Sequence, residues 1–163
     1  MGNIKAKTHL EKLGFSEKDK KNSQHDVIQE WTYRNIESIL NETVMKKNPH
    51  PYTIGQVKWE HQVMHINGNF KMVVGFIDLQ VVVDGQFYFT DSKQYENYKK
   101  PIFIEVKNQI PNLGELIRQM RAYQAYAGYW TEYMVVSPDD RFKSILNEQG
   151  FWFYKYKDST KLF

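Results

Sequence analysis

A segment with a helical pattern lies between two short apolar runs of this sequence, and this arrangement leaves few folds open. Residues 101–107 (PIFIEVK) and 133–137 (YMVVS) have the apolar character of buried strands. Between them, residues 112–128 repeat apolar side chains at helical spacing. A helix that joins two strands of one sheet returns the chain to the sheet's starting edge, so the two strands run parallel. This unit therefore predicts an α/β fold with a sheet flanked by helices.

Further elements are predicted on both sides of this unit. Asn67-Gly68-Asn69 is a hairpin turn signal, so the sheet is expected to be mixed. Residues 46–55 hold two prolines and a glycine and are predicted to be a loop, and residues 84–100 form a polar, tyrosine-rich excursion. The other predicted elements are a helix at 26–42, strands at 57–66 and 70–83, a short strand at 86–90 inside the excursion, a short helix ending near 148 and a strand at 151–156. The expected order is α-β-β-β-α-β followed by α-β.

Composition limits the class of protein. The chain has 163 residues, 41% of them hydrophobic, which suits a single domain over residues 1–163. Residues 1–25 are polar and are expected to form a mobile N-terminal segment. The chain has no cysteine, which excludes thiolate metal ligands, and no run approaches ~18 apolar residues, so we expect a cytoplasmic protein without membrane contact. The formal net charge of +3 permits nucleic-acid binding but does not identify it.

Two carboxylates interrupt predicted apolar strands. Asp78 lies within residues 70–83, and Glu105 lies within residues 101–107. An ionised carboxylate is costly to bury unless it is paired or bound to a metal, and two of them on neighbouring strands repel each other. A divalent cation between them would remove that repulsion, so the pair predicts a metal site.

The residues that follow Glu105 fit such a site. Residues i and i+2 of a strand share a face, so Lys107 points the same way as Glu105, while the carbonyl of Val106 can be a further ligand. Oxygen ligands of this kind suit Mg²⁺, for which Mn²⁺ can substitute. The Lys107 ammonium could orient an attacking water or stabilise developing phosphate charge. The alternative is that Asp78, Glu105 and Lys107 form a metal-free ion-pair group.

The helix at 112–128 offers groups for a phosphate backbone. Gln119 and Tyr123 are four residues apart and share a helix face, and Arg118 and Arg121 lie beside them. The alternative is an ordinary amphipathic helix with its polar side in water. Lys99 and Lys100 immediately precede the site strand and are further candidates for backbone contacts, although most lysines of such a chain are solvated surface.

These motifs together resemble the PD-(D/E)xK nuclease superfamily, whose members share the restriction-endonuclease-like fold. Gly75-Phe76-Ile77-Asp78 is similar to the first motif, Glu105-Val106-Lys107 to the E-x-K, and Gln119 to Tyr123 to the Q-x-x-x-Y of RecB-like and phage exonucleases. The resemblance implies that Asp78 and Glu105 bind metal, that Lys107 assists the water and that Gln119 supports the site. It also implies a metal-shell glutamate in the first helix, for which Glu30 is the choice and Glu37 the rival.

The expected function is therefore Mg²⁺-dependent hydrolysis of DNA, with endonuclease and exonuclease activity both open. The alternative is a nuclease-like subunit that binds DNA or a protein partner in a recombination or mobile-element complex without cutting. Tyr126, Tyr129 and Trp130 could be buried at a homodimer interface, as in many small nucleases.

Overall fold

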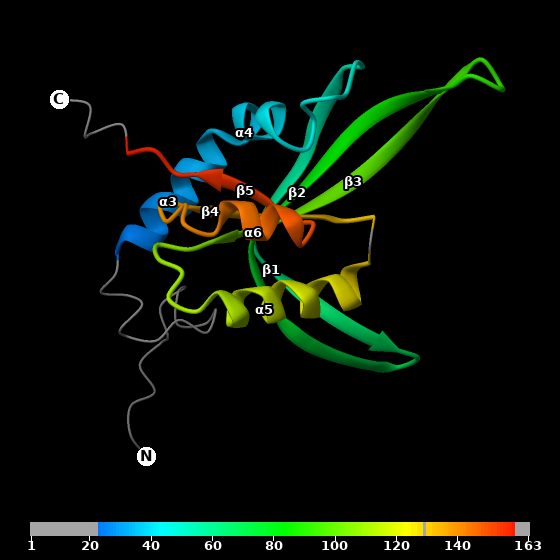
Figure 1. Cartoon of the computed structure of the whole chain (residues 1–163). Helices are drawn as coiled ribbons and strands as arrows, with labels where there is room; N and C mark the ends of the chain where they lie inside the picture. The colour runs from blue at the N-terminus through cyan, green and yellow to red at the C-terminus, as the bar shows by residue number, and fades with distance from the viewer. Residues whose placement is uncertain (1–22, 129, 159–163) are drawn as a thin grey trace.

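The computed structural model describes residues 23–128 and 130–158 and contains a five-stranded sheet with the order β1-β2-β3-β4-β5. Helices flank this sheet on both faces (Figure 1). The elements are α3 (Ser23–Arg34), α4 (Ile36–Glu42), β1 (Tyr52–Asn67), β2 (Phe70–Phe89), β3 (Gln94–Val106), α5 (Leu113–Ala127), β4 (Glu132–Ser137), α6 (Lys143–Glu148) and β5 (Trp152–Lys155).

The sheet is mixed, as the sequence predicts. The first three strands form an antiparallel meander, because β1 pairs with β2 and β2 with β3 in opposite directions. The last three run parallel, with α5 crossing between β3 and β4 and α6 crossing between β4 and β5. The predicted α/β class is confirmed, and the element order matches the prediction except that the first helix is divided in two.

Two apolar cores lie on opposite faces of the sheet. On one face, α3 and α4 place Ile28, Ile39 and Leu40 against the alternating residues of the central strands. On the other face, α5 and α6 place Met120 and Leu146 against the residues of opposite parity in β3 and β4. The central strands are therefore buried on both sides, which accounts for their nearly continuous apolar sequences.

The strands at the meander end are longer than predicted. β1 begins at Tyr52, inside the predicted loop at 46–55, and β2 continues through the predicted separate strand at 86–90. The excursion at 84–100 is the far half of the β2–β3 hairpin, in which Asp84 pairs with Lys99 and Gln86 with Asn97. Both long hairpins extend from the core as arms, one of them beside α5 (Figure 1). The β1–β2 hairpin with its turn at 67–69 was predicted, but the full length of the β2–β3 arm was not, because its solvated strands lack the apolar alternation that predicts a strand.

The predicted helix at 26–42 is two helices. Asn35 lies between α3 and α4 with φ −109° and ψ 16°, and its amide side chain donates a hydrogen bond to the Trp31 carbonyl at 2.8 Å. Such a side-chain bond offers the backbone an alternative to the helical ladder. α3 also begins at Ser23, three residues before the predicted start of the helix at residue 26. The predicted segment 1–25 lies outside the described residues except for 23–25. Among the described helices, none has the length and apolar character to span a membrane.

Candidate active site

The candidate site lies at a fork between β2 and β3. The ladder between these strands ends at the pair of Leu79 with Ile104, and continuing its register places Asp78 beside Glu105. Beyond this point Asp78 Oδ2 accepts a hydrogen bond of 2.6 Å from the backbone amide of Val106. The carboxylate thus replaces the strand carbonyl that would continue the ladder. Asp78 and Glu105 are 5% and 4% exposed, so the predicted burial of both carboxylates is confirmed.

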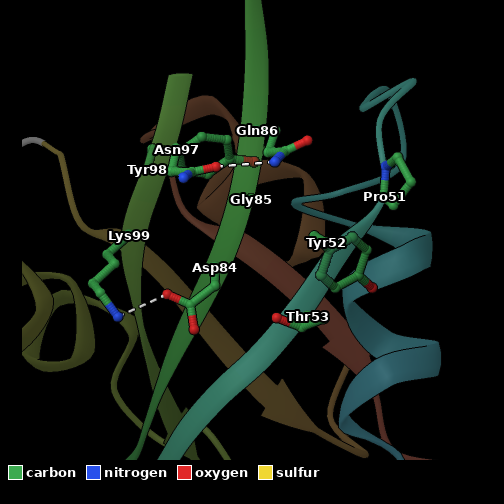
Figure 2. A pocket seen from close by; sticks show the side chains of 9 residues that line it. All are labelled: Pro51, Tyr52, Thr53, Asp84, Gly85, Gln86, Asn97, Tyr98 and Lys99. Atoms are coloured by element: carbon green, nitrogen blue, oxygen red, sulfur yellow. Dashed lines mark hydrogen bonds and ion pairs between the residues drawn. The ribbon is translucent and has the colours of Figure 1, made fainter. Parts of the chain in front are cut away.

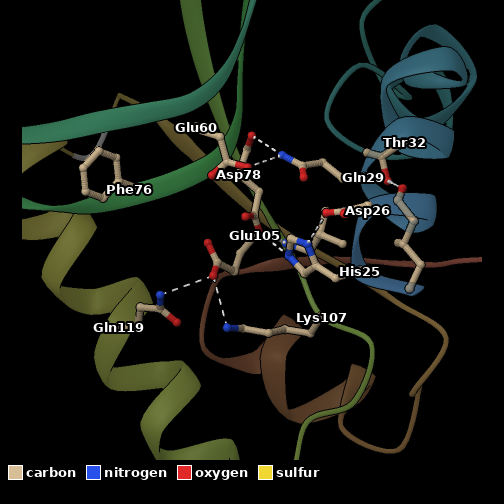
Figure 3. A network of polar contacts seen from close by, with 12 residues as sticks. His25, Asp26, Gln29, Thr32, Glu60, Phe76, Asp78, Glu105, Lys107 and Gln119 are labelled. Carbon is tan, nitrogen blue, oxygen red and sulfur yellow. Dashed lines mark hydrogen bonds and ion pairs between the residues drawn. The ribbon is translucent and has the colours of Figure 1, made fainter. Parts of the chain in front are cut away.

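The two oxygens of Glu105 differ in their surroundings. Oε1 accepts a hydrogen bond from Gln119 Nε2 at 3.2 Å and lies 3.2 Å from Lys107 Nζ (Figure 3). Oε2 is buried and has no hydrogen-bond partner among the described residues. Burial raises the pKa of Glu105, the charge of Asp78 raises it further, and the Lys107 ammonium opposes both. A buried, underbonded carboxylate oxygen of this kind is the position that a cation would stabilise.

Helix α3 brings His25 and Gln29 to Asp78, and neither was predicted. His25 Nε2 lies 3.5 Å from Asp78 Oδ2 (Figure 3). Burial of the imidazole lowers its pKa, but the hydrogen bond to Asp78 and the charges of Asp78, Glu105 and Asp26 outweigh burial and raise the pKa to about 9. Gln29, which is 2% exposed, donates a hydrogen bond of 2.9 Å from its amide to the Asp78 carbonyl. Gln29 therefore fixes α3 against β2.

A third carboxylate, Glu60, approaches from β1. The register pairs Trp59 with Leu79 and His61 with Ile77, which places Glu60 beside Asp78. Glu60 has φ 51°, a left-handed conformation that is rare for a glutamate within a strand. Its Oε1 accepts a hydrogen bond of 3.0 Å from Gln29 Nε2. Burial raises the pKa of Glu60, the hydrogen bond from Gln29 lowers it, and the charge of Asp78 raises it again. The resulting pKa is about 7.

Helix α5 is fastened to β2 through the predicted Gln119 and Tyr123. Gln119 Nε2 donates to the Tyr123 hydroxyl at 2.9 Å, and that hydroxyl donates to the Phe76 carbonyl at 3.0 Å. Tyr123 is 4% exposed, and a Cβ at Gly75 would lie 2.9 Å from its ring. The missing side chain of Gly75 thus makes room for this ring, and Gly75 also lies beside a register shift in the β1–β2 ladder. Tyr123 is buried between helix and sheet, which differs from the DNA-facing position predicted for it.

The predicted helix glutamates lie away from the carboxylate pair. The side chain of Glu30 is 58% exposed and forms an ion pair of 2.7 Å with Arg34, one turn along α3. Glu37 lies on α4. Burial raises the pKa of Tyr52, and the charge of Glu37 raises it further. The structure instead brings His25, Gln29 and Glu60 to the place where the helix carboxylate was expected.

The two arginines predicted to contact DNA lie on α5 and are exposed. Arg118 is exposed on α5, next to Gln119. Arg121 donates hydrogen bonds to the Gln149 carbonyl and side chain and lies over the Phe151 ring, so it joins α5 to the segment after α6.

Lys99 and Lys100 lie roughly 20 Å along β3 from Glu105, given ~3.3 Å per residue. Lys99 forms an ion pair of 2.9 Å with Asp84, and Lys100 pairs with Glu132 at 3.0 Å. Lys99 also lines a cavity of about 740 Å³ at the base of the β2–β3 arm, where Gln86 donates to Asn97 (Figure 2). The cavity holds neutral or paired polar groups, so it adds no chemistry to the site.

The carboxylate pair fits a hard divalent cation. Within residues 23–128 and 130–158, no group of three or more His, Cys, Asp or Glu side chains is arranged as a metal site. A cation at Asp78 and Glu105 would therefore need main-chain oxygen and water to complete its shell, which is typical of Mg²⁺. The free Oε2 of Glu105 and the oxygen-only carboxylate donors agree with that choice.

Comparisons with known proteins give little to add. No protein-family model matches the chain, and no curated protein matches it. A crystal structure of a repair endonuclease from Pyrococcus abyssi is similar, with 14% sequence identity and a TM-score of 0.32. The match covers 77% of this chain and 46% of that chain, so the chain spans about half the length of the endonuclease. At this TM-score the likeness carries no weight for fold or function, which rest on the topology and the site geometry.

Proposed function

We propose that this chain is a Mg²⁺-dependent nuclease that hydrolyses DNA phosphodiester bonds. The observation that carries the proposal is a pair of buried carboxylates on neighbouring strands, one with an oxygen that lacks a hydrogen-bond partner among the described residues. A lysine ammonium lies 3.2 Å from the other oxygen of that carboxylate. Two carboxylates and an ammonium in this arrangement suit a cation, its bound water and a phosphate.

Asp78, Glu105 and the Val106 carbonyl are the groups that would hold the cation. When bound, Mg²⁺ supplies a water of lowered pKa and polarises the phosphoryl oxygen. Lys107 would donate hydrogen bonds to that water or to the phosphate oxygens, and Gln119 holds Glu105 in place through its 3.2 Å bond. Gln29 holds the backbone of Asp78, so helix α3 and helix α5 each fix one of the two carboxylates.

The proposal is tested by incubating linear, circular, single-stranded and branched DNA with purified protein and Mg²⁺ or Mn²⁺. We expect cleavage that EDTA abolishes, and a rate at least about 100-fold lower for Lys107→Ala, since it removes a donor near the reacting phosphate. Lys155→Ala is the matched control, because Lys155 forms a surface ion pair of 3.0 Å with Asp140. Cleavage of circular DNA would establish endonuclease activity. A protein that cuts none of these substrates and behaves like Lys107→Ala would contradict the proposal.

A second candidate is a nuclease-like module that binds DNA or a partner without cutting. It is favoured by the ion pairs of Asp78 with His25 and of Glu105 with Lys107, which supply positive charge to both carboxylates without a metal. Calorimetric titration with Mn²⁺ separates the two. Mn²⁺ binding by the parent that is lost in Asp78→Asn supports the nuclease. The absence of Mn²⁺ binding in both the parent and Asp78→Asn supports the module that does not cut, called the silent module below.

A further inference from the structure

An aromatic pocket lies against the candidate site, between α3 and β1. Its volume is about 560 Å³. Its lining residues are Asp26, Gln29, Glu30, Tyr33, Arg34, Trp59 and Glu60. The pocket therefore combines two large rings with a group of polar and acidic side chains.

The rings of the pocket belong to Tyr33 and Trp59. Their centroids are 5.2 Å apart and their planes meet at 48°, so the two faces are inclined rather than stacked closely. The two residues are 44% and 40% exposed. Exposed aromatic faces in a concave site are the surface that a flat apolar or aromatic ligand covers most favourably.

The pocket is connected directly to the carboxylate pair. Gln29 and Glu60 line the pocket, and their side chains are hydrogen bonded to each other at 3.0 Å. The same Gln29 amide donates to the Asp78 carbonyl at 2.9 Å. One layer of side chains therefore separates the pocket from Asp78. A group in the pocket and a group at Asp78 would therefore be neighbouring parts of one ligand.

The charges of the pocket exclude a phosphate as its occupant. Asp26 and Glu60 are acidic, and the cation among the lining residues, Arg34, is ion paired with Glu30 at 2.7 Å. An anion would be repelled by these carboxylates. A planar neutral group with N–H donors would stack on the rings and donate to the carboxylates, and a nucleobase has both properties.

We propose that the pocket between α3 and β1 receives one unpaired nucleobase of the DNA strand whose adjacent phosphodiester lies at Asp78 and Glu105. The choice of DNA as ligand rests on the proposed function. A base inside a duplex cannot enter such a pocket, so the substrate class is DNA with unpaired bases: single strands, frayed ends or branch points.

The first experiment measures binding of a fluorescein-labelled single-stranded oligonucleotide by anisotropy, with Mg²⁺ present, on the Lys107→Ala background. We expect Tyr33→Ala and Trp59→Ala each to weaken binding about 10-fold, the scale of one base–aromatic contact, and Tyr33→Phe to retain it. Tyr88→Ala is the matched control, because Tyr88 lies on the β2–β3 arm and is 41% exposed. Melting curves identify any variant that fails to fold, and in that case the abasic series described next, measured on the protein with both rings intact, decides the result.

The second experiment asks whether a base or the backbone is recognised. An abasic residue is moved through the oligonucleotide one position at a time. We expect one position at which it weakens binding, and no such position in the Tyr33→Ala, Trp59→Ala double variant. Uniform affinity across all positions, or equal binding by both proteins, would overturn the pocket.

The two proposals fail separately. A protein that cuts DNA while Tyr33→Ala and Trp59→Ala bind and cut as the parent does contradicts the nucleobase pocket and leaves the nuclease standing. A protein that shows the position-dependent abasic effect and cuts no DNA contradicts the nuclease and supports the pocket.

Discussion

Gln119 joins two roles in one side chain, since its amide lies 3.2 Å from Glu105 Oε1 and 2.9 Å from the Tyr123 hydroxyl. Of the two groups described at Glu105 Oε1, only Lys107 would remain if Gln119 were removed. We expect Gln119→Ala to lower Mn²⁺ affinity and cleavage by about 10-fold to 100-fold, the usual effect of losing a group that orients a metal ligand. Calorimetry and a cleavage time course measure the two effects.

The control for this prediction is Gln124→Ala. Gln124 lies on the same helix and accepts a hydrogen bond of 2.8 Å from Arg121, away from the carboxylates. Equal Mn²⁺ affinity in Gln119→Ala and Gln124→Ala would show that the Gln119 bond does not orient Glu105.

Glu60 makes the metal-free protein sensitive to pH. Its pKa is raised in the folded state from 4.5 to about 7, chiefly by burial, so the folded state favours the protonated form. The stability that it contributes is complete below the unfolded pKa of 4.5 and is lost as the pH rises through about 7. His25, with its pKa raised to about 9, loses its contribution in the same direction, between 6.5 and 9.

We therefore expect the melting temperature in EDTA to fall between about pH 5 and pH 8. The free energy of unfolding should fall over the same pH range. In Glu60→Gln this loss should be smaller by on the order of 1 kcal/mol, after allowing for the partial exposure of Glu60. Urea unfolding at both pH values measures the difference. The Gln side chain retains an acceptor for Gln29, so a variant with the same pH profile as the parent would assign the titration elsewhere.

The residues that could be predicted are those whose charge conflicts with their own strand. Asp78, Glu105 and Lys107 stand in apolar runs, so the sequence itself indicates that they need partners. His25, Gln29 and Glu60 have no such local signal, because they meet only through the packing of α3 and the pairing of β1. Glu30 was chosen by position along the helix. The buried face of α3 carries Gln29 instead, and one residue of rotation directs Glu30 into solvent.

At the scale of elements, Gly75 sets how closely α5 approaches β2. A Cβ at this position would lie 2.9 Å from Tyr123 Cε1 and 3.2 Å from the hydroxyl, and the ring is buried. We expect Gly75→Ala to lower the free energy of unfolding by about 1–3 kcal/mol, the usual effect of overpacking. Denaturant titration measures this loss.

A glycine on α5 provides the opposite expectation. A Cβ at Gly114 would meet Asn112 Oδ1 at 3.4 Å, and alanine favours helix over glycine by roughly 0.5–1 kcal/mol. Gly114→Ala should therefore leave stability unchanged or raise it. If Gly75→Ala were as stable as Gly114→Ala, the helix would not be held at the distance that the structure shows.

The central elements and the β1–β2 hairpin could be predicted, whereas the β2–β3 arm could be predicted only in part, through the strand at 86–90. The spacing of apolar residues in the sequence predicts strands that are buried on both faces and helices that have one apolar face. The β2–β3 arm is held instead by cross-strand aromatic contacts, such as Tyr88 with Tyr95, and by polar pairs. These pairs become visible only once the register is known, so residues 84–100 read as an excursion.

In the whole molecule, residues from β1, β2, β3, α3 and α5 form the site. It lies where the β2–β3 ladder ends, next to residues of both apolar cores. Folding therefore brings the carboxylates of Asp78 and Glu105 together in a buried place. The charge of Asp78 raises the pKa of Glu105 after burial does, so the two groups oppose each other in the metal-free protein. Stability and metal binding are consequently linked at this pair.

This linkage gives a prediction with opposite signs in two conditions. In EDTA at about pH 8, Glu105→Gln should melt at a higher temperature than the parent, because it removes one of two repelling charges. With Mg²⁺ at about 100 times its Kd, the parent should gain ~2.7 kcal/mol, or several degrees of melting temperature, while Glu105→Gln gains almost nothing. Asp140→Asn, at a surface ion pair, is the control that should respond to Mg²⁺ as the parent does. If Mg²⁺ and Mn²⁺ raised the melting temperature of Glu105→Gln as much as that of the parent, the cation would bind elsewhere on the molecule. The ion pairs with His25 and Lys107 would then be sufficient to balance the buried charge, as the silent module requires.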